Sequence, residues 1–293
     1  AGVPLVATGS WTGNIQLWDG STSSLQSMGG QKEAHEDRIM GLDMIEKEGS
    51  GVLATASLDT TLKLWKLVKA DLGNDEERME TDENDVVLIE AAHLKGHLRR
   101  LCRVQFHPLK EYVATTSCDH TWRLWSTETG QSLLLQDGHA SECYGIGFHG
   151  DGSLCSTTDF SGIVRLWDLR TGMSIHHFHG HAKRVLNAEF HPNGFQLATG
   201  GDDGTTKIWD LRRRRTIATI PVHSNVVTRL KFNSSGEFMA SSSFDGTVKL
   251  WSCRDWRQVG QLEGHEGKVS GMDFVDDTSF VSCGHDKTLK RWH

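Results

Sequence analysis

The sequence has little proline, little tyrosine and no long apolar run. Its 293 residues include only 4 Pro and 2 Tyr, and no apolar stretch approaches the roughly 18 residues that a membrane-spanning helix needs. No apolar segment of the kind that forms the core of a signal peptide opens the chain. We therefore expect no interaction with a membrane.

The six cysteines form no C-x-x-C pair. They are scattered along the chain at positions 102, 118, 143, 155, 253 and 283, which suits neither a disulfide framework nor a zinc site and favours a reducing compartment. The run 176–181 (HHFHGH) could place two imidazoles on one face of a strand. However, no Cys or carboxylate lies close to it in the sequence, and its last histidine belongs to a repeated series. We predict no metal site and no cofactor.

Tryptophan, in contrast, is frequent and regularly spaced. Seven of the 10 Trp residues close similar segments such as IQLWD and VRLWD, at successive intervals of 47, 60, 42, 42, 42 and 41 residues. A histidine precedes six of them by 27 to 30 residues. Self-similarity at a fixed interval indicates a repeat protein. The two series are Trp18, Trp65, Trp125, Trp167, Trp209, Trp251 and Trp292, and His35, His97, His139, His181, His223 and His265.

Each repeat contains four short segments of alternating apolar residues, separated by turn residues. Gly-His near the start and Trp-Asp near the end of a unit of about 42 residues are typical of the WD40 repeat. The whole chain resembles the WD40 family, which implies an all-β fold with residues 1–293 forming one seven-bladed β-propeller. We count 26 strands, two fewer than seven complete blades need. The expectation is that about 20 upstream residues of a longer protein supply the other two.

The repeated residues suggest a buried hydrogen-bond chain in each blade, because an imidazole and an indole N–H need partners once they are buried. We expect the His, a Ser or Thr on the second strand, the turn Asp and the Trp to form it. The complete sets are His35, Ser57, Asp59 and Trp65; His97, Ser117, Asp119 and Trp125; and His223, Ser243, Asp245 and Trp251.

Three repeats depart from this pattern. In the fourth, Asp159 and Ser161 exchange places, and the fifth and seventh have Gly201 and Gly284 at the serine position. These blades are expected to be held less firmly.

His, Ser and Asp also occur together in hydrolases. Here the combination recurs around a ring and always accompanies a Trp, which favours a structural role over a catalytic one. A catalytic site would need a non-repeating polar cluster in the channel, and the sequence shows none. We predict that the protein is not an enzyme and has no small-molecule substrate.

Charge is concentrated in two segments. Residues 69–90 contain nine acids and two bases, a net charge of −7 that equals the charge of the whole chain. This segment is predicted to be a solvent-exposed insertion between the third and fourth strands of the second blade, with an acidic arm for a basic partner as the alternative. The corresponding turn of the fifth repeat carries Arg212, Arg213, Arg214 and Arg215. This basic turn could contact phosphates, act as a nuclear address or be a solvated corner.

One rim of the propeller is the candidate partner-binding surface. In the WD40 architecture, the loop after each repeated His and the turn before each Trp emerge on the same rim. Alternating bases and aromatics at these positions suit a peptide-binding surface, or RNA contacts through stacking and phosphate pairing. The candidates are Trp11, Arg38, Arg99, Arg100, Phe160, Lys183, Arg184, Phe244, Lys268 and His285.

Several segments narrow the resemblance within the WD40 family. GSWTGNIQLWD, DHTWRLW, KIWDLRRRRTIATIPVH and LEGHEGKV, in this order, resemble the family of WD40 subunits of the U4/U6 small nuclear ribonucleoprotein, which are pre-mRNA splicing factors. The insertion at 69–90 departs from the compact pattern expected there. The resemblance implies a nuclear, non-enzymatic scaffold of the U4/U6 and U4/U6.U5 particles that binds splicing proteins. Direct contact with U4/U6 RNA stays open. The alternative is a WD40 adaptor of another class, either a ubiquitin-ligase substrate receptor or a signalling scaffold.

Overall fold

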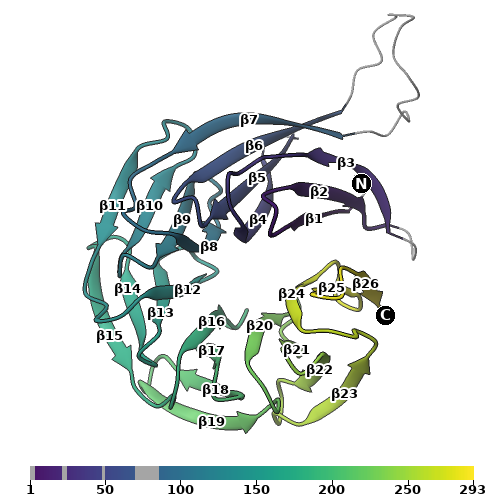
Figure 1. Cartoon of the computed structure of the whole chain (residues 1–293). Helices are drawn as coiled ribbons and strands as arrows, with labels where there is room; N and C mark the ends of the chain where they lie inside the picture. The colour runs from purple at the N-terminus through teal and green to yellow at the C-terminus, as the bar shows by residue number, and fades with distance from the viewer. Residues whose placement is uncertain (1–3, 22–24, 48–49, 70–85) are drawn as a thin grey trace, which may run out of the picture.

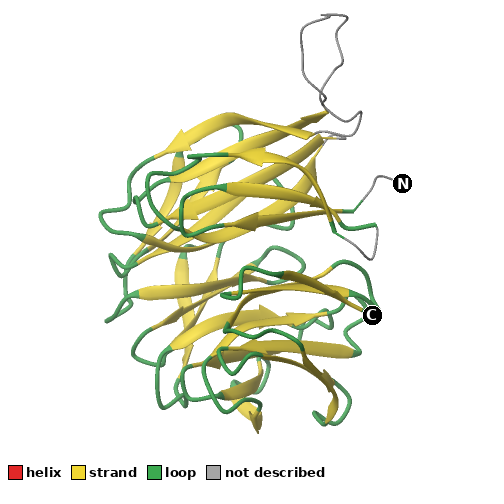
Figure 2. Ribbon diagram, turned by 45° about the vertical axis from the view of Figure 1, so that its right-hand side comes forward, coloured by secondary structure: helices red, strands yellow, loops and turns green. Residues whose placement is uncertain are grey.

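Seven antiparallel sheets are arranged radially around a central channel and form a seven-bladed β-propeller (Figure 1). The computed structural model describes residues 4–21, 25–47, 50–69 and 86–293. Within these ranges the chain consists of strands joined by loops and turns (Figure 2), and no helix in them is long and apolar enough to cross a membrane. The predicted all-β propeller fold is confirmed.

The described residues form 26 strands, as the repeats predict, and each blade pairs its strands in chain order from the channel outward. Blades 1 to 3 contain β1 (Leu5–Gly9), β2 (Ile15–Asp19) and β3 (Gln26–Gln31); β4 (Ile39–Lys47), β5 (Ser50–Ser57), β6 (Leu62–Lys69) and β7 (Val86–Leu94); and β8 (Leu101–Phe106), β9 (Tyr112–Ser117), β10 (Trp122–Ser126) and β11 (Ser132–Gln136). Blades 4 and 5 contain β12 (Cys143–Phe148), β13 (Leu154–Asp159), β14 (Val164–Asp168) and β15 (Met173–Phe178); and β16 (Val185–Phe190), β17 (Gln196–Gly201), β18 (Thr205–Asp210) and β19 (Arg215–Pro221). Blades 6 and 7 contain β20 (Val227–Phe232), β21 (Phe238–Ser243), β22 (Thr247–Ser252) and β23 (Gln258–Glu263); and β24 (Val269–Phe274), β25 (Phe280–Gly284) and β26 (Leu289–Trp292).

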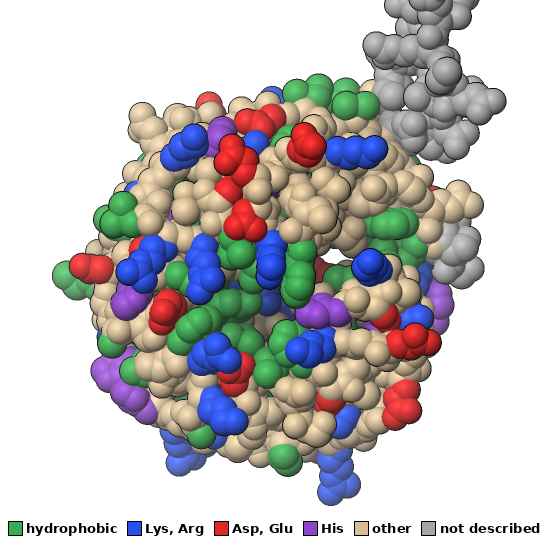
Figure 3. Space-filling view, in the orientation of Figure 1, with side chains coloured by type: hydrophobic (Ala, Val, Ile, Leu, Met, Phe, Trp, Pro, Cys, Tyr) green, Lys and Arg blue, Asp and Glu red, His purple; other side chains and the backbone are tan. Residues whose placement is uncertain are grey.

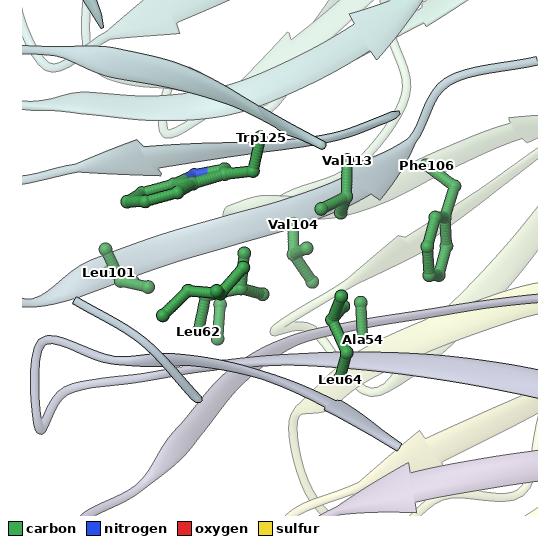
Figure 4. Close-up of a cluster of buried hydrophobic side chains, with 10 residues drawn as sticks. Ala54, Leu62, Leu64, Leu101, Val104, Phe106, Val113 and Trp125 are labelled. Carbon is green, nitrogen blue, oxygen red and sulfur yellow. The ribbon is translucent and has the colours of Figure 1, made fainter. Parts of the chain in front are cut away.

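The hydrophobic core lies between the blades. Six clusters of buried side chains occur among the described residues, one for each pair of successive blades. Between blades 2 and 3, Leu62 and Leu64 of one sheet pack against Leu101, Val104 and Trp125 of the next (Figure 4). Since sheets packed face to face bury both of their faces, the inner strands consist mainly of apolar and small residues.

A hydroxyl joins the repeated His to the Trp, but it is not the predicted one. In blade 3 the Trp125 indole N–H donates to Thr115 Oγ1 over 2.8 Å, and this oxygen lies 2.9 Å from His97 Nε2. Ser117 Oγ instead accepts a hydrogen bond from the Asp119 amide at 3.1 Å. Ser117 ends β9 beside the turn, whereas Thr115 lies on the same face one step deeper, within reach of the indole. The assignment of this link to Ser117 was therefore wrong, and so were those to Ser57 and Ser243, which likewise bond to the amides of Asp59 and Asp245. The link is made by a Ser or Thr of the second strand, as expected, but by the one two residues earlier.

All six blades with a repeated His contain the complete chain of hydrogen bonds. Asp159 occupies the position of Ser117 in its blade and still bonds to His139. Gly201 and Gly284 occupy the same position in blades 5 and 7, where no side chain takes part in the hydrogen bonds between His and Trp. The weaker connection expected in blades 4, 5 and 7 is therefore not found in these hydrogen bonds. The linking hydroxyls are those of Thr55, Thr115, Thr157, Thr199, Ser241 and Ser282, and the carboxylates, each 2.8–2.9 Å from a His Nδ1, are those of Asp59, Asp119, Asp159, Asp203, Asp245 and Asp286.

These hydrogen bonds run in one direction. The indole donates to the hydroxyl oxygen, the hydroxyl donates to Nε2, and Nδ1–H donates to the carboxylate, which requires a neutral imidazole. Burial lowers the pKa of His97 and His223, although the nearby carboxylates oppose this, and so favours the neutral ring. Burial would raise the pKa of Asp59 and Asp119, but hydrogen bonds from the imidazole and the turn threonine lower it below its ordinary value.

The predicted insertion is shorter than residues 69–90. Lys69 ends β6 and pairs with Val86, and the ladder continues to the pair Trp65 and Glu90. Val86 and Leu88 are buried in the core between blades 1 and 2. The apolar alternation of VVLIE therefore belongs to β7, and the prediction of a solvent loop over residues 86–90 was wrong. The rest of the predicted insertion, residues 70–85, lies outside the described residues.

A polar cluster that does not repeat lines the channel, contrary to the expectation from the sequence. Lys231 Nζ lies 3.4 Å from Glu189 and 3.8 Å from Asp273. Burial raises the pKa of Glu189, and it raises that of Asp43 to about 6. Asp273 and Glu189 raise the pKa of Lys231, which stays protonated and is no nucleophile at neutral pH. Glu189, Lys231 and Asp273 stand at one position of three successive inner strands, at intervals of 42 residues, and Asp43 lies on the inner strand β4.

Two substitutions in blade 3 test whether Thr115, and not Ser117, links His97 to Trp125. Thr115→Val keeps the shape of the side chain but leaves the Trp125 N–H and His97 Nε2 without partners, so we expect a loss of about 2–4 kcal/mol in the free energy of unfolding. Ser117→Ala removes contacts of the turn and should cost about 1 kcal/mol. Urea denaturation measures both. If Ser117→Ala lost as much free energy of unfolding as Thr115→Val, or more, the assignment of the link to Thr115 would be contradicted.

The channel cluster can be tested with Lys231→Met. Without the ammonium group the carboxylates of Glu189 and Asp273 lose their counter-charge, so we expect a loss of stability of about 1–3 kcal/mol near neutral pH. A carboxyl whose pKa is raised in the folded protein binds its proton more tightly there than in the unfolded chain, so acidification restores stability. The loss should therefore shrink between about pH 8 and about pH 5. Lys207→Met, whose ammonium group bonds to Thr219, is the control, and a loss that grows on acidification would refute this account.

Candidate functional site

Backbone hydrogen bonds build the candidate rim. In each of six blades, the residue three positions after the repeated His accepts a hydrogen bond from an amide in the turn before the Trp. The rim therefore carries paired residues, held next to the buried hydrogen-bond chain. The pairs, with N···O distances of 2.8–3.1 Å, are Arg38 and Leu58, Arg100 and Cys118, Glu142 and Phe160, Arg184 and Asp202, Val226 and Phe244, and Lys268 and His285.

Five of the predicted residues form one continuous cluster, which we name the seam cluster because it joins the first and last blades. The Arg38 guanidinium lies 4.5 Å from the centre of the Trp11 ring, and Trp11 meets His285 edge to face at 4.9 Å. His285 lies 5.7 Å from Phe244, over which Lys268 Nζ is placed at 4.9 Å. Trp11 is 58% exposed. Cations and aromatic faces thus alternate along an accessible surface.

A second group of rim residues lies farther round the ring. The Arg184 guanidinium stands 5.1 Å from the Phe160 ring and bonds to Asp202. Phe160 also packs against Tyr144, with ring centres 5.4 Å apart. The structure thus divides the predicted rim into two aromatic groups rather than one continuous band.

The three other predicted rim bases are exposed. Arg99 and Lys183 lie at the surface of their loops, and Arg100 Nε bonds to the Cys118 sulfur at 3.3 Å. Lys183 lines a surface hollow of about 520 Å³ together with Phe160 and Arg184. These bases widen the positive surface around the aromatic groups.

A cavity of about 620 Å³ reaches the rim at the seam cluster. Below Trp11, Phe244, Lys268 and His285, its lining includes Arg103 and Arg229 from two inner strands, together with apolar residues of β1 and β24. On the face drawn in Figure 3, Lys and Arg side chains surround the central hollow, with hydrophobic side chains between them. The seam cluster therefore stands at the mouth of a space that is large enough for side chains of a partner.

Arg103 and Arg229 are not among the site residues that the sequence pattern predicts. Arg103 is 8% exposed and donates to the carbonyl oxygens of Met40 and Thr228, both at 3.3 Å. Burial and the neighbouring charge of Arg229 lower the pKa of Arg103 to about 10. Arg229 stands two residues before Lys231 on its inner strand, and Arg103 occupies the equivalent position three repeats, or 126 residues, earlier. Comparison of the inner strands, rather than of the loops alone, would have indicated them.

The basic turn lies at the opposite end of the strands from the rim. It connects β18 to β19, and the four arginine side chains are exposed. Arg212 lies 4.2 Å above the Phe195 ring, and Arg212 and Arg213 both approach the Asp210 carboxylate at 3.9 Å. Since the rim and the basic turn are on different sides of the propeller, a small ligand cannot contact both.

The arrangement of the rim suits recognition of a partner. In the described part of the chain, no three His, Cys, Asp or Glu side chains are grouped to hold a metal ion. In the histidine-rich run, His181 bonds to Asp203 and Thr199 as part of its blade. What the rim offers is aromatic faces, positive charge and a cavity.

Comparisons with known proteins agree with this geometry. The family model described as "WD domain, G-beta repeat" matches residues 90–126, 130–168, 172–210, 214–252 and 256–293. The U4/U6 small nuclear ribonucleoprotein PRP4 of Saccharomyces cerevisiae is 32% identical over 46% of this chain and 25% of its own length. An uncharacterized WD repeat-containing protein of Schizosaccharomyces pombe, C227.12, is 37% identical over 38% of this chain and 21% of its own length. Human coronin-7 is 32% identical over 32% of this chain and 9% of its own length.

This chain thus spans a quarter or less of each of these relatives. The five family matches, in contrast, cover more than half of this chain and extend from β7 of blade 2 to β26 of blade 7. The chain belongs to the WD40 family and is a propeller scaffold.

Proposed function

We propose that this chain is a nuclear, non-enzymatic scaffold of the U4/U6 and U4/U6.U5 ribonucleoproteins in pre-mRNA splicing. The similarity to the U4/U6 protein PRP4 over 134 residues is the observation that carries this assignment. In this role the propeller binds splicing proteins and holds them next to the U4/U6 RNAs. Direct contact with U4/U6 RNA is a further part of the proposal.

The seam cluster is the proposed partner-binding surface. Exposed Trp and Arg side chains are enriched among the residues that dominate the energy of protein interfaces. Trp11 and Arg38 already pack against each other in the free protein, so a partner does not have to order these two side chains when it binds. The surrounding bases favour a partner segment that carries negative charge.

The alternative is a WD40 adaptor of another class, such as a ubiquitin-ligase substrate receptor or a signalling scaffold. Other WD40 relatives match this chain at a similar level, including human coronin-7 at 32% identity and the nuclear distribution protein PAC1 of Gibberella zeae at 27%. The same rim would then receive a different partner.

Affinity purification from native nuclear extract tests the assignment. Tagged wild-type protein should co-purify with U4 and U6 RNAs and with splicing proteins. Trp11→Ala and Arg38→Ala should each reduce the recovery of these proteins by about tenfold, the effect expected of an interface hot spot. Because Trp11 is largely exposed, its replacement should not change the melting temperature.

Phe195→Ala provides the matched control. Phe195 is 48% exposed and also carries a stacked arginine, but it lies on the opposite side of the propeller. Its replacement should leave the recovery unchanged. Absence of U4 and U6 RNAs from the wild-type sample would overturn the splicing assignment, and equal losses for Trp11→Ala and Phe195→Ala would overturn the assignment of the rim.

A further inference from the structure

Two free cysteines meet below the rim of blade 3. Cys102 lies on β8 and Cys118 directly follows β9, and their sulfur atoms are 3.4 Å apart. Cys102 is the additional residue of a bulge, because Leu101 pairs with Ser117 whereas Arg103 pairs with Thr116. The bulge turns its side chain towards Cys118. A disulfide would require the two sulfur atoms to approach by roughly 1.4 Å.

The surroundings distinguish the two sulfur atoms. The Arg100 Nε–H donates to Cys118 Sγ at 3.3 Å, and Arg100 itself is exposed. A hydrogen bond from the Cys102 thiol lowers the pKa of Cys118, burial opposes this, and Arg100 lowers the pKa further. Glu142, across the turn, acts in the opposite direction. The hydrogen bond to Cys118 and burial raise the pKa of Cys102.

The other four cysteines lack this environment. Cys143 and Cys155 are fully buried, and burial raises the pKa of both thiols. Burial also raises the pKa of Cys253 to about 12, and that of Cys283. A thiolate is the reactive form of cysteine, and a positive neighbour favours it. Cys118 is only 5% exposed, less than Cys253 and Cys283, but its sulfur accepts a hydrogen bond from the exposed Arg100. Cys118 is therefore the cysteine best placed to react.

We propose that Cys118 and Cys102 form a reversible oxidation site for hydroperoxides, with Cys118 as the attacking sulfur and Cys102 as the resolving thiol. In the first step the Cys118 thiolate forms a bond to one peroxide oxygen, the O–O bond breaks and hydroxide leaves. This oxidises the sulfur to a sulfenic acid and reduces the peroxide. In the second step Cys102 attacks the Cys118 sulfur, a disulfide forms, and the hydroxyl group leaves as water with the thiol proton.

Oxidation alters the rim of blade 3. The disulfide removes the negative charge that Cys118 offers to Arg100 and releases this guanidinium from its contact at 3.3 Å. The site goes beyond the proposed splicing role, because it depends only on the local geometry of β8, β9 and the turn. It holds whichever partner the rim receives.

Peptide mapping of the purified chain tests the proposal. After treatment with hydrogen peroxide and alkylation, trypsin should release residues 101–103 and 111–123 as one disulfide-linked product that dithiothreitol separates. Two of the six thiols should be lost, and Cys143, Cys155, Cys253 and Cys283 should stay available for alkylation after unfolding. Recovery of the two peptides unlinked, or loss of other thiols first, would overturn the proposal.

Three variants separate the roles of the residues. Cys102→Ser should allow a sulfenic acid on Cys118 to accumulate, where dimedone traps it, and Arg100→Gln should slow alkylation of native Cys118 by about tenfold. Cys283→Ser is the matched control and should still form the disulfide. A dimedone adduct on Cys118 that is equally abundant in wild type and Cys102→Ser would show that Cys102 does not resolve it. Mapping of the wild-type chain gives its answer even if a variant fails to fold.

Discussion

The hydrogen-bond chain from indole to carboxylate is the interaction on which the rest of the structure depends. It connects the third strand of a blade, which carries the Trp, to the second strand, which carries the hydroxyl, and to the loop that carries the His. The same indole packs against the preceding blade, as Trp125 does against Leu62 and Leu64. One side chain thus fixes both the shape of a blade and its place in the ring. This explains why the Trp recurs more regularly than any other residue.

The binding surface follows from this network. The loop that holds each His also holds a rim residue three positions later, and a backbone hydrogen bond attaches it to the turn that carries the network carboxylate. The rim can therefore vary from blade to blade while its backbone stays the same. Arg38 faces a leucine, Arg184 an aspartate and Lys268 a histidine in the same geometry. The fold provides equivalent positions, and their side chains decide what is bound.

The charged side chains near the rim of the channel differ from those deeper in it. Near the rim, Arg103 and Arg229 line the cavity. Deeper along the inner strands, Lys231 lies among Glu189, Asp273 and Asp43. Low-dielectric surroundings make such charges costly unless each has a partner, which accounts for the raised pKa of Asp43 and Glu189. The charge of the channel is therefore arranged in layers rather than spread evenly, and the layer nearest the rim is positive.

The sequence alone determined the repeat, the propeller, the number of strands and the position of the rim, because all of them follow from local periodicity in apolar, His and Trp residues. It also indicated the members of the seam cluster, although not that Trp11 and His285, 274 residues apart, touch across the junction of the first and last blades. Only the tertiary structure decided which hydroxyl joins His to Trp, where β7 begins, and that Cys102 meets Cys118. These depend on strand register, on a bulge and on the closing of the ring, which bring together side chains that no local pattern relates.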